Sequence, residues 1–189
     1  DVHVLPRNHG TYFCHQLMLM SSPHEWYAPV DADDWVDPEH LERMAALGCS
    51  AVAPAAVWFH SGAGVRYWAG KAGQHPLYHV GRFATSRMLG VGGYDPQERV
   101  GQDTVLLRML RTTGPLIRWA PPDPTYHRIR HAGTLTTSPQ TGLRSAERRA
   151  ARSRNRQVYV AAAKLGTAEA IARYRLGRIR PDVRRALAE

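Results

Sequence analysis

The chain has 189 residues, 43% of them hydrophobic, which suits one domain with a sizeable core plus an appendage. It contains no apolar run of about 18 residues and no signal-peptide pattern, so we expect no spanning helix and a cytoplasmic location. The formal charge of +9 comes from one end: residues 1–143 hold 12 Lys or Arg and 12 Asp or Glu, whereas residues 144–189 hold 13 and 4. We therefore expect a neutral domain over 1–143 and an Arg-rich basic tail over 144–189.

The first part of the chain alternates short apolar runs with helical patterns. We expect a strand over 2–5, then a helix over 11–22 that ends before Pro23. Residues 26–30 (WYAPV) are typical of a strand whose C-terminal end presents the stretch DADD. The next helix is expected to start with Asp37 as its N-cap and Pro38 in its first turn, and to end at Gly48.

The same alternation continues to the end. We expect strands over 49–60 and 65–70, a strand and short helix over 81–89, a glycine-rich loop over 90–96, an amphipathic helix over 101–114, and a last strand over 115–122. From residue 126 the chain is expected to leave the core, and beyond 145 to be helical with breaks at Gly166 and Pro181. This order predicts an α/β protein with a layered sheet.

Four acids fall within seven positions, at Asp31, Asp33, Asp34 and Asp37. Like charges this close repel each other, and a divalent cation such as Mn²⁺ or Mg²⁺, which takes carboxylate oxygens, relieves the repulsion. A solvated acidic turn is the alternative interpretation. Asp37 is assigned to the helix cap alone.

Several motifs surround this D-x-D-D stretch in a fixed order. Asn8 and Gly10 precede it, and Arg82, the loop Val91–Asp95, the pair Gln102-Asp103, and Tyr126, Arg128 and His131 follow it. In order and spacing, over roughly residues 1–140, the series resembles the family-2 glycosyltransferases of the GT-A fold. The resemblance implies a GT-A-like mixed sheet flanked by helices. It also implies a metal-dependent, inverting transfer of a sugar from a nucleotide-diphosphate sugar, with a UDP-sugar favoured, to a hydroxyl acceptor on a glycan, lipid or protein.

The resemblance assigns donor and metal roles to individual residues. Asp33 would bind Mn²⁺ or Mg²⁺ directly, with Asp31 beside the ribose or the metal. His131 would lie near the metal and the diphosphate, with an ordinary surface histidine as the alternative, and Asn8 would lie on the donor side. The other histidines show no spacing typical of metal ligands, and no zinc motif is present.

The resemblance also assigns the acceptor side. Gly92, Gly93 and Tyr94 would lie under the acceptor site, although a glycine loop can equally serve backbone geometry alone. Asp103 would be the general base that takes the proton of the acceptor hydroxyl. The alternative for Asp103 is a first-turn acid stabilised by the helix dipole.

The chain departs from the family pattern at two places. His15-Gln16 replaces an Arg-Asn pair, and the strands that normally form the first half of the nucleotide pocket do not precede Asp1. A second hypothesis is therefore a non-catalytic remnant of the fold that acts as a binding or interaction module. The basic tail could pack on the domain as a solvated helix or contact an anionic membrane surface at the inner face. Nucleic acid is the least favoured partner, because no recognition motif accompanies the charge.

Overall fold

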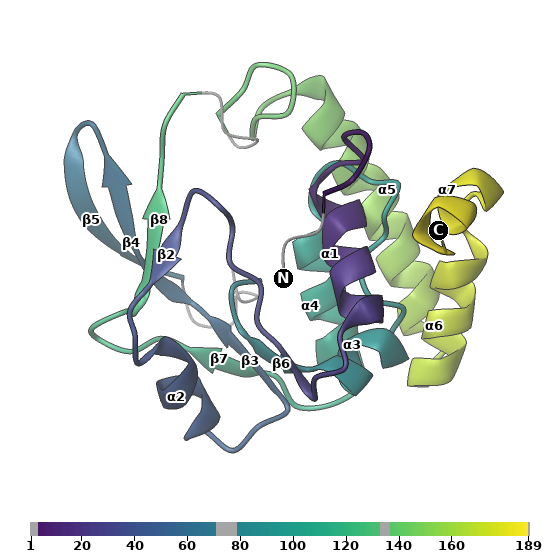
Figure 1. Cartoon of the computed structure of the whole chain (residues 1–189), viewed down its shortest axis with the longest axis horizontal. Helices are drawn as coiled ribbons and strands as arrows, with labels where there is room; N and C mark the ends of the chain where they lie inside the picture. Colours follow the sequence, from purple (N-terminus) through teal and green to yellow (C-terminus); the bar gives the residue numbers. More distant parts are fainter. Residues whose placement is uncertain (1–3, 71–78, 133–136, 189) are drawn as a thin grey trace.

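The computed structural model describes residues 4–70, 79–132 and 137–188, and over these it is a mixed α/β protein with two mixed four-stranded sheets (Figure 1). In spatial order the first sheet contains β1 (Trp26–Tyr27), β6 (Arg82–Ala84), β3 (Ala51–Pro54) and β7 (Ile117–Trp119). The second contains β2 (Trp35–Val36), β8 (Tyr126–Ile129), β4 (Ala56–Ser61) and β5 (Gly64–Ala69). Each sheet has one parallel pair, β3 with β7 and β4 with β8.

The apolar stretch 49–60, expected as one strand, forms β3 and β4, which belong to different sheets. Between them, the N–H of Ala55 donates to the carbonyl of Trp119 at 2.7 Å, and the carbonyl of Ala55 accepts from Gly70 at 2.8 Å. Pro54, the last residue of β3, has no backbone N–H to donate, and the chain changes sheet just after it. The single sheet expected from the sequence is therefore divided in two.

Seven helices lie within the described residues: α1 (Thr11–Ser21), α2 (His40–Ala45), α3 (Thr85–Gly90), α4 (Gln102–Thr112), α5 (Ala146–Ala163), α6 (Ala168–Gly177) and α7 (Pro181–Ala188). Figure 1 shows α1, α4, α5, α6 and α7 gathered on one side of the molecule and the second sheet on the other. In the part of the chain that the structure describes, no helix is both long and hydrophobic enough to cross a bilayer.

The helices expected over 11–22 and 101–114 and the three expected in the basic tail (residues 144–189) are all present. The tail helices pack on the preceding domain, because α5 contacts α4 and α6 contacts α3. Ala162 and Ile171 belong to the same buried cluster as Leu106 and Leu110 of α4. Two other apolar residues of the tail, Leu165 and Leu176, are exposed.

One charged side chain of the tail is buried in this junction. Arg175 is 5% exposed, and its Nη1 donates to the carbonyl of Val91 at 2.6 Å. Burial lowers the pKa of Arg175 to about 10, against the opposing effect of Asp95. The partner of this charge is a loop carbonyl of the first 143 residues, so the tail and the glycine loop are held together.

Three local expectations are wrong. The strand expected over 26–30 ends at Tyr27, two residues before Pro29. Helix α2 begins at His40 with Glu39 at its N-cap, and Asp37 makes no cap bond because its carboxylate pairs with His127.

The segment from Tyr126 does not leave the core: it forms β8, the strand between β2 and β4, and Tyr126 is 1% exposed. The strand expected over 2–5 lies partly outside the described residues, and residues 4 and 5 form no strand.

Candidate active site

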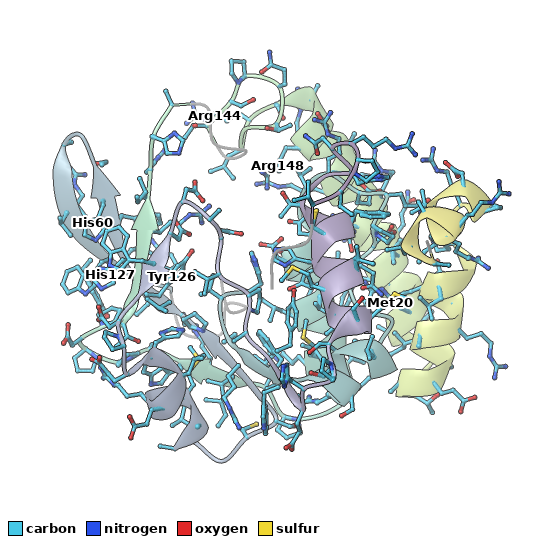
Figure 2. The ribbon with its side chains drawn as sticks, viewed as in Figure 1. Met20, His60, Tyr126, His127, Arg144 and Arg148 are labelled. Carbon is cyan, nitrogen blue, oxygen red and sulfur yellow. The ribbon has the colours of Figure 1, made fainter. Side chains whose placement is uncertain are left out.

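A cavity of about 410 Å³ lies between α1, the acidic turn, β8 and the start of α4. Its lining includes Asp31, Asp33 and Asp103, three residues that the sequence assigned to one site. Figure 2 labels Tyr126 of β8 and Arg148 of α5, which also line this cavity, from the sheet side and the helix side. The fold thus brings the predicted metal-binding turn and the predicted base to the same space.

The acidic turn is fixed by its last acid. The N–H of Asp34 donates to the carbonyl of Asp31 at 3.0 Å, which closes the turn. The Asp34 carboxylate accepts from the hydroxyl of Tyr126 and, at 2.9 Å, from the N–H of Ile129. Burial raises the pKa of Asp34 despite these bonds. Asp34 therefore anchors the turn on β8 and leaves Asp31 and Asp33 to face the cavity.

Asp31 lies beside two histidines that the sequence did not single out as ligands. One ligand atom each from His15, Asp31 and His79 can be chosen so that all lie within 4.8 Å of one another. Nε2 of His79 is 3.5 Å from Oδ1 of Asp31 and, although buried, has no hydrogen-bond partner among the described residues. A buried imidazole nitrogen that faces a carboxylate, with a second imidazole beside them, is a donor set that suits a metal ion.

The ring of His15 is held in place by two tyrosines. Nδ1 of His15 lies 2.9 Å from the hydroxyl of Tyr27, and this hydroxyl donates to the backbone carbonyl of His15 at 3.4 Å. The hydroxyl oxygen can then accept a hydrogen bond from Nδ1–H. In this tautomer the lone pair of Nε2 is free for a ligand bond. His15 also packs against Tyr94, with ring centroids 5.1 Å apart.

The charges of this cluster depend on one another. Burial, followed by the charge of the neighbouring His79, lowers the pKa of His15 to about 4. Burial alone would raise the pKa of Asp31, but His79, His15 and Arg128 together bring it below its ordinary value. Burial likewise opposes protonation of His79, yet Asp31 raises its pKa. At neutral pH the site therefore combines an ionised Asp31 with a neutral His15, whereas a cation bound by His79 would have to displace the proton that Asp31 favours there.

Asp103 lies in the first turn of α4, but it does not cap the helix. The N-cap is Gly101, which has a φ of 80° and no side-chain cap bond. Oδ1 of Asp103 instead accepts from the hydroxyl of Tyr12 at 3.2 Å, across the interface with α1. The carboxylate is thus held at the cavity wall by a neighbouring helix.

The glycine loop packs against His15 through Tyr94 and does not line the cavity. Gly92 and Gly93 have φ values of 84° and 60°, as expected for a loop that needs glycine. The N–H of Tyr94 donates to Oε1 of Gln16 at 2.7 Å, and a Cβ on Gly93 would lie 2.1 Å from the same oxygen. Tyr94 is fully buried. The role of this loop under an acceptor stays a prediction.

Two other residues that were predicted to belong to the site, Asn8 and His131, are exposed. Asn8 is exposed, accepts from the N–H of Gly10 at 2.9 Å just before α1, and does not line the cavity. Nε2 of exposed His131 is 3.5 Å from Oδ2 of Asp33, so these two lie together but apart from the His15, Asp31 and His79 group. An exposed pair of this kind contributes little to stability.

A separate chain of polar residues lies on the second sheet. Nε2 of His127 is 3.0 Å from Oδ1 of Asp37, and its Nδ1 is 3.0 Å from Nε2 of His60. Trp35 stacks on His127 with ring centroids 4.9 Å apart. Figure 2 shows His60 and His127 close together on the sheet side of the molecule. Neither residue lines the cavity, so this chain holds β2, β4 and β8 together outside the site.

Sequence reasoning missed His15, His79 and Tyr12. His15 was noted only as a departure from an Arg-Asn pair, and His79 is far from both partners in the chain. A comparison with protein-family models finds no match, and a comparison with curated proteins finds no significant match. Inference about function therefore depends on the residues and their geometry.

Proposed function

We propose that the chain is a metal-dependent glycosyltransferase with a GT-A-type site, which transfers a sugar from a nucleotide-diphosphate sugar to a hydroxyl acceptor. One observation carries the proposal: the cation-binding turn and Asp103, far apart in the sequence, line one cavity. A glycosyl transfer needs both functions within reach of one anomeric carbon, a cation site for the leaving diphosphate and a carboxylate for the acceptor.

The metal would be held by Asp31 with His15 and His79, and Asp33 lines the same cavity. Two imidazoles and a carboxylate favour a transition-metal ion such as Mn²⁺ over Mg²⁺, which prefers oxygen ligands. When bound, the cation would neutralise charge on the diphosphate. The position of the buried His79 nitrogen, 3.5 Å from Oδ1 of Asp31, supports this assignment.

Asp103 would act on the acceptor. Its carboxylate takes the hydroxyl proton while the oxygen forms a bond to the anomeric carbon from the face opposite the leaving group. The bond from that carbon to the phosphate oxygen breaks, and its electron pair leaves with the nucleoside diphosphate. The anomeric configuration is inverted in this single displacement. Tyr12 keeps the carboxylate oriented, because its hydroxyl donates to Oδ1.

The experiment is a calorimetric titration of UDP, then GDP, into the whole chain with and without Mn²⁺. Asp31→Asn tests the turn, and Asp123→Asn, at an exposed position away from the cavity, is the matched control. Nucleotide binding that needs both Mn²⁺ and Asp31 supports a donor site, and donor hydrolysis or transfer is then measured with Asp103→Asn. Absence of binding to either nucleotide in all conditions would favour the non-catalytic binding module.

A further inference from the structure

A second, larger cavity continues from the candidate active site. This groove has a volume of about 880 Å³ and lies between α4, α5 and the end of β8. Asp103, Arg128, Ile129 and Arg148 line both spaces, so the two cavities meet at the proposed base. A hydroxyl that reaches Asp103 from the groove would meet a sugar held on the side of the acidic turn.

The groove is strongly cationic. Six arginines line it, Arg108, Arg128, Arg130, Arg148, Arg152 and Arg156, whereas Asp103 is its one carboxylate among the described residues. Arg148, Arg152 and Arg156 recur every four residues on α5, a spacing that places them along one face of the helix. The charge of the basic tail is therefore focused on the groove and not only spread over solvent.

Some arginines outside the groove have carboxylate partners. Arg154 of α5 binds Glu98 through two hydrogen bonds of 2.8 Å, and Arg173 pairs with Glu169 at 2.9 Å. Within the described residues, Arg152 and Arg156 have no such carboxylate partner. Positive charges without carboxylate partners in a concave site raise the local electrostatic potential, and a bound anion lowers it.

Part of this charge is already held in place. The guanidinium of Arg108 lies over the ring of Tyr159, 5.2 Å from its centroid, and its buried Nε has no hydrogen-bond partner among the described residues. Arg148 donates from Nε to the carbonyl of Thr141 at 3.0 Å. Planar guanidinium groups positioned in this way suit the bidentate recognition of phosphate oxygens.

We infer that the groove binds the acceptor and that this acceptor carries a phosphate group near the hydroxyl that receives the sugar. The inference rests on the proposed function, which gives Asp103 its role. The phosphate is bound by the arginines of α5, and the hydroxyl is directed to Asp103 at the junction of the two cavities. The phosphate can belong to a soluble molecule or to a lipid headgroup, and the test separates these sources.

The probe for a soluble phosphate is tripolyphosphate, titrated into the whole chain at near-physiological ionic strength with EDTA to exclude metal effects. The probe for lipid-borne phosphate is a phosphatidylcholine vesicle with a minority of phosphatidic acid, measured by co-sedimentation. The test variant is Arg152→Gln with Arg156→Gln. The matched control is Arg149→Gln with Arg185→Gln, which removes two exposed arginines that do not line the groove.

We expect the groove variant to weaken the binding of one probe about tenfold or more and the control variant to weaken it less than about twofold. Loss with tripolyphosphate identifies a soluble acceptor, and loss with vesicles alone identifies a lipid-linked one. Asp103→Asn should tighten binding of the same probe, because it removes the carboxylate at the junction. No binding of either probe, or equal losses in the two double variants, would overturn the inference.

Failure of this inference can be told apart from failure of the proposed function. Mn²⁺-dependent UDP binding is measured on the same proteins, because Arg152 and Arg156 do not line the first cavity. UDP binding without binding of either phosphate probe would exclude a phosphorylated acceptor but would still support the proposed donor site. Probe binding without UDP binding keeps an anion groove and removes the transfer reaction. A DNA duplex whose binding depends equally on both arginine pairs would assign the charge to nucleic acid and contradict the inference.

Discussion

The hydroxyl of Tyr12 donates to Oδ1 of Asp103 at 3.2 Å and accepts from the N–H of Gly101 at 3.1 Å. One side chain of α1 thus fixes both the start of α4 and the orientation of the carboxylate that follows it. Burial, followed by the charge of Asp103, raises the pKa of Tyr12 well above its ordinary value, so the phenol stays protonated and donates.

Replacement of Tyr12 by Phe should therefore lower the free energy of unfolding by about 1–2 kcal/mol, because two hydrogen bonds are lost in a partly buried place. In a transfer assay kcat should fall more than KM changes. The proposed base loses the hydrogen bond that orients it, whereas the proposed donor site keeps its residues. Urea unfolding and steady-state kinetics measure these effects. Tyr67→Phe, at an exposed position on β5, should change stability by less than about 0.5 kcal/mol.

The metal assignment predicts a specific loss at His79. His79→Ala should weaken Mn²⁺ and Zn²⁺ binding by at least about tenfold, since even outer partners of a metal site contribute that much. Calorimetry with each metal, and the absorption of bound Co²⁺, report the result without an activity assay. His24→Ala, at an exposed position after α1, is the control. Equal affinity of the two variants, or a preference for Mg²⁺, would contradict the assignment.

The sequence predicted some features of the fold and of the candidate site and missed others. It predicted α1 and α4 from helical spacing and glycine at Gly92 and Gly93 from loop geometry, because these depend on local contacts. It also predicted that Asp31 and Asp103 belong to one site. It could not predict His79, whose role depends on tertiary contacts with His15 and Asp31 that no periodicity records.

The same limit explains the errors. Asp37 followed by Pro38 has the local pattern of a helix cap, but the Asp37 carboxylate pairs with His127 of β8 instead. The stretch 49–60 has the uniform hydrophobicity of one buried strand, and only the pairing of its two halves with different neighbours divides it between sheets. In both places a long-range partner overrides a local preference, which is why propensity alone fails.

Substitution of the adjacent acids Asp33 and Asp34 should lower stability to very different extents. Asp34→Ala should lower the free energy of unfolding by about 2–3 kcal/mol, because the hydroxyl of Tyr126 and the N–H of Ile129 lose their acceptor. Asp33→Ala should cost less than about 0.5 kcal/mol, because its pair with His131 is exposed. Chemical denaturation measures both. Similar losses in the two variants would show that Asp34 does not anchor the turn.

The glycine loop offers a test of steric fit. Gly93→Ala should destabilise the protein by about 2–4 kcal/mol, since it combines a positive φ with a clash against Gln16. Gly62→Ala, where a Cβ meets open space, should be within about 0.5 kcal/mol of the parent. A tolerated Gly93→Ala, measured by urea unfolding, would mean that Gln16 can move away and does not fix the loop.

Acid sensitivity should arise in part from His40. This side chain is 1% exposed, and its Nδ1 lies 2.7 Å from the hydroxyl of Thr125. Burial lowers its pKa from 6.5 to about 4, against the carboxylates of Asp37 and Glu39, which raise it. The folded state therefore keeps the ring neutral at a pH where the unfolded chain binds a proton.

The sign of the effect follows from this difference. The unfolded state binds more protons below its pKa, so the contribution of His40 is complete above about pH 6.5 and is lost as the pH falls towards 4. The loss should be about 1–3 kcal/mol across that window. His40→Gln should be less stable than the parent near neutral pH but should show a shallower decline, whereas His24→Gln should keep the parent slope. Urea unfolding at a series of pH values measures the slopes, and an unchanged slope for His40→Gln would show that folding does not lower the pKa of His40.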